Sequence, residues 1–254
     1  MKKGKIVITK NGPYQVSGGL PLGKEIAEVG EDGEPQKWRK GKSYPAREDY
    51  ALCRCGRSGN KPYCDQTHAQ AGFDGTETAS REPYARQAKT ITGPGMDLLD
   101  AEPLCSEARF CHPQGDTWHL TLQSFDPAKK KEAIRQACHC PSGRLLARDK
   151  KSGKPIEPDW EPAISLVEDP QKKASGPIWV KGGVRIESED GRAYETRNRV
   201  TLCRCGQSDN KPFCVGNHIR AQFNDGDPSL QGEKMGTKRA ASGRRQSQAT
   251  RKKT

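Results

Sequence analysis

The chain has 254 residues, of which 31% are hydrophobic and 6% aromatic, and its net charge is +12. This composition excludes a protein built on one large apolar core, because small modules with thin cores usually depend on a disulfide or a metal. The apolar run near the start, residues 6–8, is far too short for a signal-peptide core or a membrane span. We therefore expect a cytoplasmic protein, in which clustered cysteines among the ten favour metal binding over disulfides.

The first elements expected along the chain are two short strands. Residues 5–9 are rich in β-branched side chains, residues 14–17 alternate in polarity, and Asn-Gly-Pro at 11–13 separates them, which predicts a hairpin. The charged stretch 31–34 is expected to be a loop. An extended segment over residues 44–52 then leads into the first group of cysteines.

A cysteine-rich motif follows, and it occurs again 150 residues later. Each copy contains Cys-x-Cys-Gly, in which the glycine lets two thiolates approach one metal without a side chain obstructing the bend. A Lys-Pro pair at 61–62 and 211–212 is placed where a short helix can start, and the cysteine and histidine that follow are four residues apart and would share one helix face. We predict two sites with four ligands each: Cys53, Cys55, Cys64 and His68 in the first, and Cys203, Cys205, Cys214 and His218 in the second.

Four more cysteines lie between the two copies: Cys105, Cys111, Cys138 and Cys140. Asp126-Pro127 is typical of a helix start, and the predicted helix runs to about residue 136. Ala133, Ile134, Ala137 and Cys138 recur at helical spacing and are expected to form its apolar face.

Two further segments are polar. Residues 166–176 are interpreted as a solvated linker before the second copy. The tail, residues 232–254, contains eight Lys or Arg against one Glu, which predicts disorder. A solubilising role for this tail is favoured over contact with nucleic acid, because its positive charges are not interleaved with aromatic side chains.

Three cysteines and one histidine suit either a closed structural zinc site or an iron–sulfur cluster in which histidine replaces one cysteine. The motif resembles that of the CDGSH iron–sulfur domain, the mitoNEET-like family, whose pattern is Cys-x-Cys-x2-Ser/Thr-x3-Pro-x-Cys-Asp-Gly-Ser/Ala/Thr-His. Besides the eight ligands, both copies match this pattern at Ser58, Pro62, Ser208 and Pro212.

The resemblance implies a 2Fe-2S cluster at each copy, with the Cys-x-Cys pair on one iron and the third cysteine and the histidine on the other. It also implies that each histidine is the outer, solvent-near ligand. In the family, two such modules pack about a two-fold axis with interleaved strands, so the two copies are expected to pair within the chain.

Each copy departs from the family pattern at one position beside the third cysteine. Gln66 stands where the pattern has glycine, and Val215 stands where it has aspartate. Neither change removes a ligand. Because an aspartate at the start of the ligand helix can accept backbone amide hydrogen bonds, the two clusters are expected to differ in stability and potential.

The cysteines between the copies resemble a divergent mono-cluster ferredoxin domain, which is found beside CDGSH modules in some bacterial proteins. Cys105-x5-Cys111 and a later Cys140-Pro carry this resemblance, but an ordinary ferredoxin loop has a cysteine where Ala108 stands. Three ligands remain, as in 3Fe-4S ferredoxins. A 4Fe-4S cluster would need a fourth ligand, and the candidates are Cys138, His139 and His112, although Cys138 also suits a role as a core cysteine.

The expected fold is α+β and mostly β, with two small CDGSH modules forming an internal pseudo-dimer and a ferredoxin-like domain between them. The expected boundaries are 1–80 and 177–231 for the modules, 81–165 for the middle domain, 166–176 for the linker and 232–254 for the tail.

The expected function is electron transfer or redox sensing through two 2Fe-2S clusters and one 3Fe-4S or 4Fe-4S cluster. The expected partners are redox proteins or cluster-acceptor proteins, which the sequence does not identify. No membrane contact is expected. An enzyme is not expected, because the chain shows no phosphate-binding glycine loop and no nucleophile–base signature. The alternatives are an iron–sulfur cluster carrier and, ranked lower, a zinc-stabilised adaptor.

Overall fold

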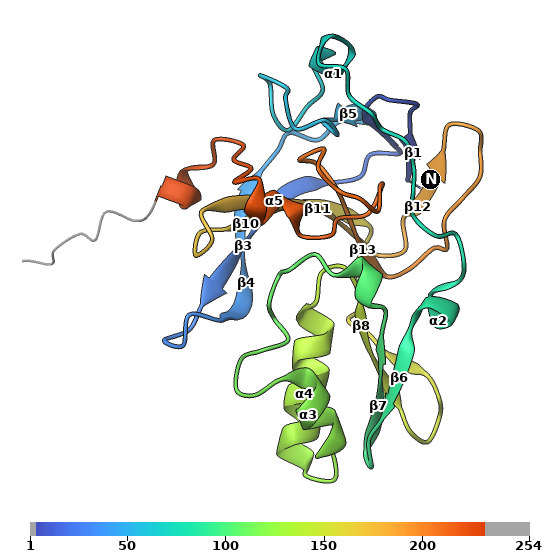
Figure 1. Cartoon of the computed structure of the whole chain (residues 1–254), viewed down its shortest axis with the longest axis vertical. Coiled ribbons are helices and arrows are strands. Elements are labelled where there is room, and N and C mark those ends of the chain that lie inside the picture. Colours follow the sequence, from blue (N-terminus) through green and yellow to red (C-terminus); the bar gives the residue numbers. More distant parts are fainter. Residues whose placement is uncertain (1–3, 232–254) are drawn as a thin grey trace, which may run out of the picture.

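The computed structural model describes residues 4–231, which form three β-sheets and several mostly short helices (Figure 1). This confirms the predicted class, α+β and mostly β. The strands are β1 Lys5–Ile8, β2 Tyr14–Ser17, β3 Leu22–Val29, β4 Pro35–Ser43, β5 Tyr50–Leu52, β6 Lys89–Thr92, β7 Met96–Asp100, β8 Leu145–Asp149, β9 Pro155–Ile156, β10 Ala163–Asp169, β11 Ala174–Lys181, β12 Arg185–Ser188 and β13 Arg199–Leu202. The helices are α1 Thr67–Gln70, α2 Tyr84–Gln87, α3 Thr117–Leu122, α4 Pro127–His139 and α5 Asn217–Arg220, with 3-10 turns η1 Glu102–Leu104 and η2 Pro228–Gln231.

Two of the sheets contain strands from both modules. Their strand orders are β12-β1-β2-β5 and β13-β11-β10-β3-β4. In each sheet a hairpin of one module, β1–β2 or β10–β11, is joined in parallel by a strand of the other module, β12 or β3. The two modules therefore form an internal pseudo-dimer in which each completes the sheet of the other.

A continuous apolar core joins the two modules. Ile6, Ile8 and Tyr14 of the first module and Ile178 and Ile186 of the second belong to one cluster of buried side chains. The expected hairpin of residues 5–9 and 14–17 is present, and its alternation places every second side chain in this core. Burial of this shared core is what holds the pair together.

The structure corrects one prediction about this part of the chain and adds a hairpin that was not predicted. Residues 166–176, predicted to be a solvated linker, lie mainly in β10 and β11, and only the turn at 170–173 is exposed or partly exposed. The charged residues misled the prediction, because Glu168 is fully buried and forms ion pairs there. The β3–β4 hairpin was also not predicted, although residues 31–34 do lie between its two strands.

The middle domain is a sheet of order β6-β7-β8-β9 packed against α3 and α4. The predicted helix is confirmed, since α4 begins at Pro127 and the Asp126 side chain accepts a hydrogen bond from the Ala128 amide (2.8 Å). Ala133 and Ala137 of this helix are buried against the sheet. Ile134 packs against the same core, so three of the four residues of the predicted apolar face form it, and Cys138 does not.

The unpredicted β3–β4 hairpin holds the middle domain in place. Trp38 of β4 packs on Phe110, with ring centroids 4.3 Å apart, and its indole nitrogen donates to the His139 carbonyl (3.1 Å). From the second module, the buried Arg199 side chain donates to the carbonyls of Ala137 and Cys140. The middle domain is therefore fixed to both modules, beside the cysteines that it carries.

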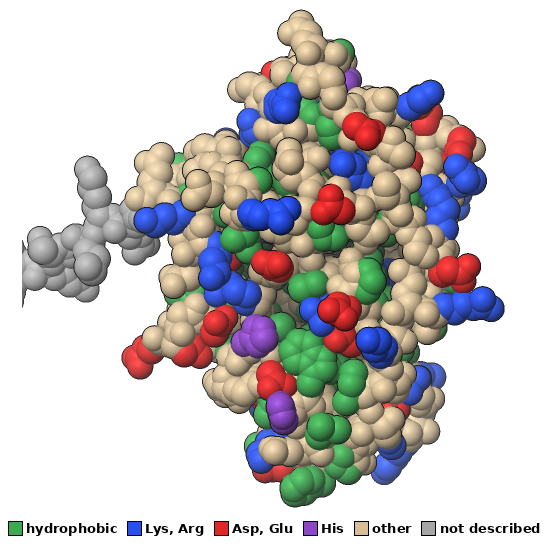
Figure 2. All heavy atoms as spheres, in the orientation of Figure 1, with side chains coloured by type: hydrophobic (Ala, Val, Ile, Leu, Met, Phe, Trp, Pro, Cys, Tyr) green, Lys and Arg blue, Asp and Glu red, His purple; other side chains and the backbone are tan. Residues whose placement is uncertain are grey.

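On the face shown in Figure 2, positive and negative side chains are interspersed over the two modules, and apolar side chains gather over the middle domain. Leu122 and Phe125, near the turn between α3 and α4, are among the exposed large apolar residues. Within residues 4–231, no helix is both long enough and apolar enough to cross a membrane. The predicted basic tail lies outside the described residues.

Candidate metal centres

The first site lies between the end of β5 and helix α1. Cys53 follows β5 directly, and its Sγ lies 3.8 Å from Cys55 Sγ. Cys64 Sγ lies 3.4 Å from Nδ1 of His68, which is on α1. The structure thus brings the four predicted residues together as two close pairs.

These distances fit metal coordination. Two sulfurs bonded at about 2.3 Å to one tetrahedral metal lie about 3.8 Å apart, and a sulfur and a nitrogen on one metal lie about 3.5 Å apart. All ten cysteines are free thiols. Each close pair therefore has the spacing of two ligands on one metal, as expected for a cluster with two irons.

Backbone amides and burial prepare the first site for a cluster. The amides of Arg57 and Gln66 each point at a thiol sulfur, of Cys55 and Cys64 respectively, at 3.4 Å. Burial raises the pKa of the Cys64 thiol. Such a thiol gives up its proton readily only when a cation compensates the charge, so the donor set suits iron bound as a cluster.

The predicted helix start at Pro62 is wrong. The carbonyl of Pro62 accepts a hydrogen bond from the Cys53 amide (2.8 Å), so the chain pairs here with the end of β5. Helix α1 begins later, at Thr67, after Gln66 in the left-handed region (φ 73°). Of the two ligands that were predicted to share a helix face, only the histidine lies on the helix.

The second site repeats this geometry but is more deeply buried. The Sγ atoms of Cys203 and Cys205 are 3.6 Å apart, and Cys214 Sγ lies 3.4 Å from Nδ1 of His218. His68 is half-buried, whereas only 4% of His218 is exposed. Burial, together with the positive charge of Arg204, lowers the pKa of His218 to about 4. The resemblance implied a solvent-near histidine in both copies, and this is wrong for the second, because the chain folds over it.

The structure explains why the two motifs differ at Gln66 and Gly216. A Cβ added at Gly216 (φ 83°) would lie 2.5 Å from Cγ of Glu107, which belongs to the middle domain. At the equivalent position of the first site, Gln66 is exposed and its side chain is tolerated. The glycine is retained where another part of the chain packs against it.

The other difference between the motifs is that Asp65 of the first site corresponds to Val215 of the second, where a neighbouring side chain supplies the hydrogen bonds instead. Asp65 accepts hydrogen bonds from the amides of Gly59 (2.7 Å) and Thr67 (3.0 Å), as expected for aspartate at the start of the ligand helix. In the second site Asn217 instead donates to the Gln207 carbonyl and to Asp209. Both ligand helices are therefore tied to the loop that follows Cys-x-Cys, by different side chains.

The two sites meet back to back. A Cβ on Gly56 would lie 2.6 Å from the Cys205 carbonyl oxygen, and a Cβ on Gly206 would lie 2.6 Å from that of Cys55. Both glycines have positive φ, 76° and 78°. This reciprocal contact is the local form of the pseudo-two-fold, and it brings the two Cys-x-Cys loops into van der Waals contact.

In the middle domain, Cys105, Cys111 and Cys140 line one cavity together with Arg144. Cys105 follows η1, and Cys140 caps the C-terminus of α4. Burial raises the pKa of the Cys111 thiol to about 12, and the fields of Cys140 and Cys105 add to this effect. The three cysteines proposed as ligands thus converge on a site that favours a bound cation.

The candidates for a fourth ligand do not line this cavity. Cys138 Sγ donates to the Ile156 carbonyl at 3.6 Å. His139 is engaged through Nδ1 with the Arg135 carbonyl (2.8 Å), and His112 is exposed beside Trp118. Cys138 is partly buried and lies outside both the cavity and the apolar cluster of this domain, so neither its role as a fourth ligand nor the alternative of a core cysteine is confirmed.

The residue between the two cysteines of each Cys-x-Cys motif is a buried arginine, and the two arginines have different hydrogen-bonding partners. Arg54 donates to the carbonyls of Thr9 (3.2 Å) and Gly75 (2.6 Å). Arg204 contacts the carboxylates of Glu168 and Asp225. The positive charge beside the second site is therefore neutralised by carboxylates, whereas the one beside the first site is hydrogen-bonded to neutral groups.

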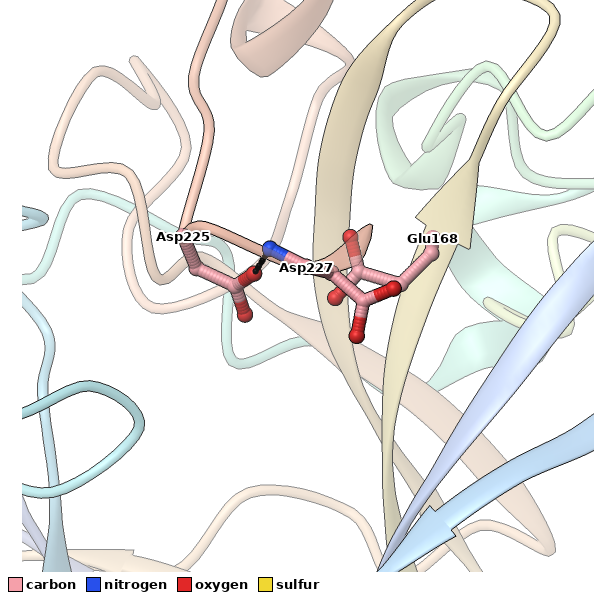
Figure 3. A group of neighbouring side chains, drawn as sticks. All are labelled: Glu168, Asp225 and Asp227. Atoms are coloured by element: carbon pink, nitrogen blue, oxygen red, sulfur yellow. Dashed lines mark hydrogen bonds between the residues drawn. The ribbon is translucent and has the colours of Figure 1, made fainter. Parts of the chain in front are cut away.

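The carboxylates around Arg204 form a cluster that was not predicted from the sequence. Figure 3 shows Glu168 on β10 and Asp225 and Asp227 on the segment after α5. Their oxygens lie within 4.8 Å of one another, which is close enough to hold a metal. The Nζ of Lys24 lies 2.8 Å from Glu168, 3.1 Å from Asp225 and 2.6 Å from Asp227. The lysine ammonium supplies the cation here, so we assign this cluster to stability.

Asp225→Asn is expected to destabilise the protein by about 3 kcal/mol, because it leaves Arg204 and Lys24 buried with one charged partner fewer. Urea unfolding followed by circular dichroism measures this change. Glu82→Gln is the control, since Glu82 pairs with Arg86 on the surface (3.5 Å) and its loss is expected to leave stability unchanged. Equal effects of the two substitutions would contradict a structural role for the buried cluster.

Comparison with family models gives matches over the three parts of the chain that contain the predicted sites. A family described as "Iron-binding zinc finger CDGSH type" matches residues 11–69 and 175–219, and one described as "Divergent 4Fe-4S mono-cluster" matches residues 91–150. Searches of curated proteins and of solved structures give no match. The matched ranges contain every cysteine and histidine assigned to the three sites. The chain is therefore an iron–sulfur protein of the CDGSH type, with two CDGSH regions in tandem and a divergent mono-cluster ferredoxin region between them.

Proposed function

We propose that this protein is a non-enzymatic electron carrier that holds two 2Fe-2S clusters and one ferredoxin-type cluster. One observation carries the proposal: the three cysteine sites are in contact through the protein. The Cys-x-Cys loops of the first and second sites touch at Gly56 and Gly206, and the loop of the middle site touches the second site at Gly216. Sites packed in this way suit the exchange of single electrons among them.

The residues of each site have separable roles. Iron–sulfur clusters supply reversible one-electron chemistry. The buried thiols and the amides that point at them favour a bound cluster over free thiolates. His68 and His218 each replace an anionic ligand by a neutral one, which makes the site less negative and raises the reduction potential. The middle site offers three thiols, which suits a 4Fe-4S cluster with one iron lacking a thiolate, or a 3Fe-4S cluster after loss of that iron.

Anaerobic reconstitution with iron and sulfide tests this proposal. We expect visible absorption, and low-temperature EPR before and after reduction with dithionite is expected to show signals of two 2Fe-2S clusters and one further cluster. The shape of the further signal distinguishes 3Fe-4S from 4Fe-4S. A colourless protein that binds zinc stoichiometrically would contradict the proposal and would support the zinc-stabilised adaptor.

Cluster donation to other proteins is a second candidate function, and it is favoured by the half-buried His68. A solvent-accessible imidazole ligand can be displaced more easily than a buried thiolate. Mixing the loaded protein with an apo-ferredoxin tests this function. Transfer that His68→Cys abolishes and His218→Cys preserves would favour a carrier, whereas unchanged iron on both proteins would favour the electron carrier.

A further inference from the structure

The two CDGSH sites are covered differently, and we propose that the loop 103–111 closes the second site while the open face around His68 is the surface on which an external redox protein docks. This inference rests on the proposed electron-carrier function. It concerns which residues cover each site, so it is tested separately from the presence of clusters.

The loop 103–111 is fastened over the second site at three points. Glu107 packs against Gly216, two residues from both Cys214 and His218. Asn210 donates from its side chain to the Pro103 carbonyl (3.0 Å). On the other side of the loop, Arg109 donates to Asp169 (2.9 Å) and Glu34 (3.2 Å).

The backbone of this loop is adapted to its position. Glu107 and Arg109 have φ of 54° and 63°, in the left-handed region that residues other than glycine seldom occupy. Such conformations persist only where the surrounding structure over-determines them. Here Phe110, between them and Cys111, is buried against Trp38. The loop is thus held from both sides, and it packs at Gly216 beside Cys214, which is 2% exposed, and His218, which is 4% exposed.

The first site has an open face instead. Asn11, His68, Phe73 and Asp74 are among the residues that line a hollow of about 410 Å³ beside the ligand histidine. In Figure 1, α1 stands at the end of the molecule remote from the middle domain, whereas α5 lies across its centre, over β11. A protein partner can therefore reach the ligand helix of the first site without displacing any part of the described chain.

The surroundings of the open face indicate the kind of partner. A neighbouring groove of about 600 Å³ shares Asn11 with the hollow. Its charged lining residues are balanced in sign: Lys10, Arg81 and Arg192 against Glu77, Glu189 and Asp190. A surface with charge of one sign attracts partners of the opposite sign, and salt screens that attraction. Because the charges of this groove are balanced, it suits a redox protein whose association rate depends little on salt concentration. In this reaction the reduced site gives one electron to the oxidised partner, no covalent bond forms or breaks, and no proton is transferred.

The buried arginines favour the same face for exchange. Reduction adds negative charge to a site, and a cation that lacks a carboxylate partner stabilises that charge more than a neutralised one. Arg54 is hydrogen-bonded to carbonyls, whereas Arg204 pairs with Glu168 and Asp225. We therefore expect the higher reduction potential at the first site, which an EPR-monitored redox titration measures, with Cys53→Ser and Cys203→Ser used to assign the signals.

The first test exchanges the residues that differ between the sites. In the reconstituted chain, an iron chelator is expected to remove iron from the first site several-fold faster than from the second. Gly216→Gln is expected to accelerate release from the second site several-fold, because the new side chain collides with Glu107. The matched change Gln66→Gly is expected to leave the first site unchanged.

A double substitution separates collision from backbone strain at residue 216. If Glu107 is the cover, Glu107→Ala by itself speeds release from the second site, and Glu107→Ala with Gly216→Gln costs less than the sum of the two single changes. Equal release from both sites of the unmodified protein would overturn the proposal. Strictly additive effects in the double variant would overturn it as well.

The second test concerns the docking face. Gln70 and Arg220 are exposed at equivalent positions of the two ligand helices. In stopped-flow mixing of the dithionite-reduced protein with oxidised cytochrome c as the probe, Gln70→Trp is expected to slow oxidation several-fold, and Arg220→Trp is expected to leave the rate unchanged. Equal slowing by both substitutions would refute the assignment of the face. Failure of the unmodified protein to become reduced would instead refute the electron-carrier function.

Discussion

Cys111→Ala is expected to abolish the middle cluster and to leave the two CDGSH clusters in place. Cys105, Cys111 and Cys140 line one cavity, and with one thiol removed only two of these ligands remain. Ferredoxin-type clusters are held by three or four thiolates, so two do not retain one. The measurement is iron content per chain together with the EPR signal of the middle cluster.

Cys138→Ala is the matched control in the same domain. Its thiol is directed at the Ile156 carbonyl, and it is absent from the residues that line the cavity. We expect this variant to keep full iron content and an unchanged spectrum. Loss of the middle cluster in Cys138→Ala would show that this cysteine rotates into the site as a fourth ligand, contrary to the arrangement described above.

Gly206→Ala is expected to loosen both CDGSH sites, because residue 206 lies at the contact between them. The new methyl group would be 2.6 Å from the Cys55 carbonyl oxygen, and the backbone at residue 206 has a φ of 78°. A left-handed φ costs about 1–2 kcal/mol for a residue with a side chain, and overpacking adds about 1–3 kcal/mol. Urea unfolding measures the loss of stability, and chelator kinetics measure the faster release of iron from both sites.

Gly153→Ala separates the two contributions. Gly153 also has positive φ (67°), but a Cβ there has nothing within 4 Å. We expect this variant to lose only the conformational part, about 1–2 kcal/mol, and to hold its iron as the unmodified protein does. If Gly206→Ala lost no more stability than Gly153→Ala and released iron no faster, the contact between the two loops would have no structural role.

Patterns that depend on neighbours in the chain were predictable from the sequence. Within each close pair the predicted ligands are two or four residues apart, so the convergence of each pair followed from spacing. Helix α4 was predictable because Asp126 caps it locally, and the first hairpin because its turn residues and alternation are local features. The placement of the helix start at Pro62 failed for the opposite reason. That proline accepts a hydrogen bond from Cys53, nine residues earlier, which is a pairing that local propensity does not contain.

The prediction of a solvated linker at residues 166–176 failed because a charged side chain is buried there. Glu168 lies in a sequence that looks like a solvated linker, and only its ion pairs with Lys24 and Arg204 make a buried strand possible there. These partners are 144 and 36 residues away in the chain. The β3–β4 hairpin was missed in the same way, because it is stabilised by packing against the middle domain and the second module.

The sequence by itself determined the family of this protein and supplied its candidate chemistry: eight predicted ligands in two copies of one motif and three further cysteines between them. It also located the two departures, at Gln66 and Val215. Only the tertiary structure decided what these differences mean. Gly216 is required where Glu107 packs on it, and Gln66 is tolerated where nothing does. The candidate ligands can be recognised from their spacing in the sequence. The exposure of each site depends on which distant segment packs over it, so two copies of one motif differ in burial.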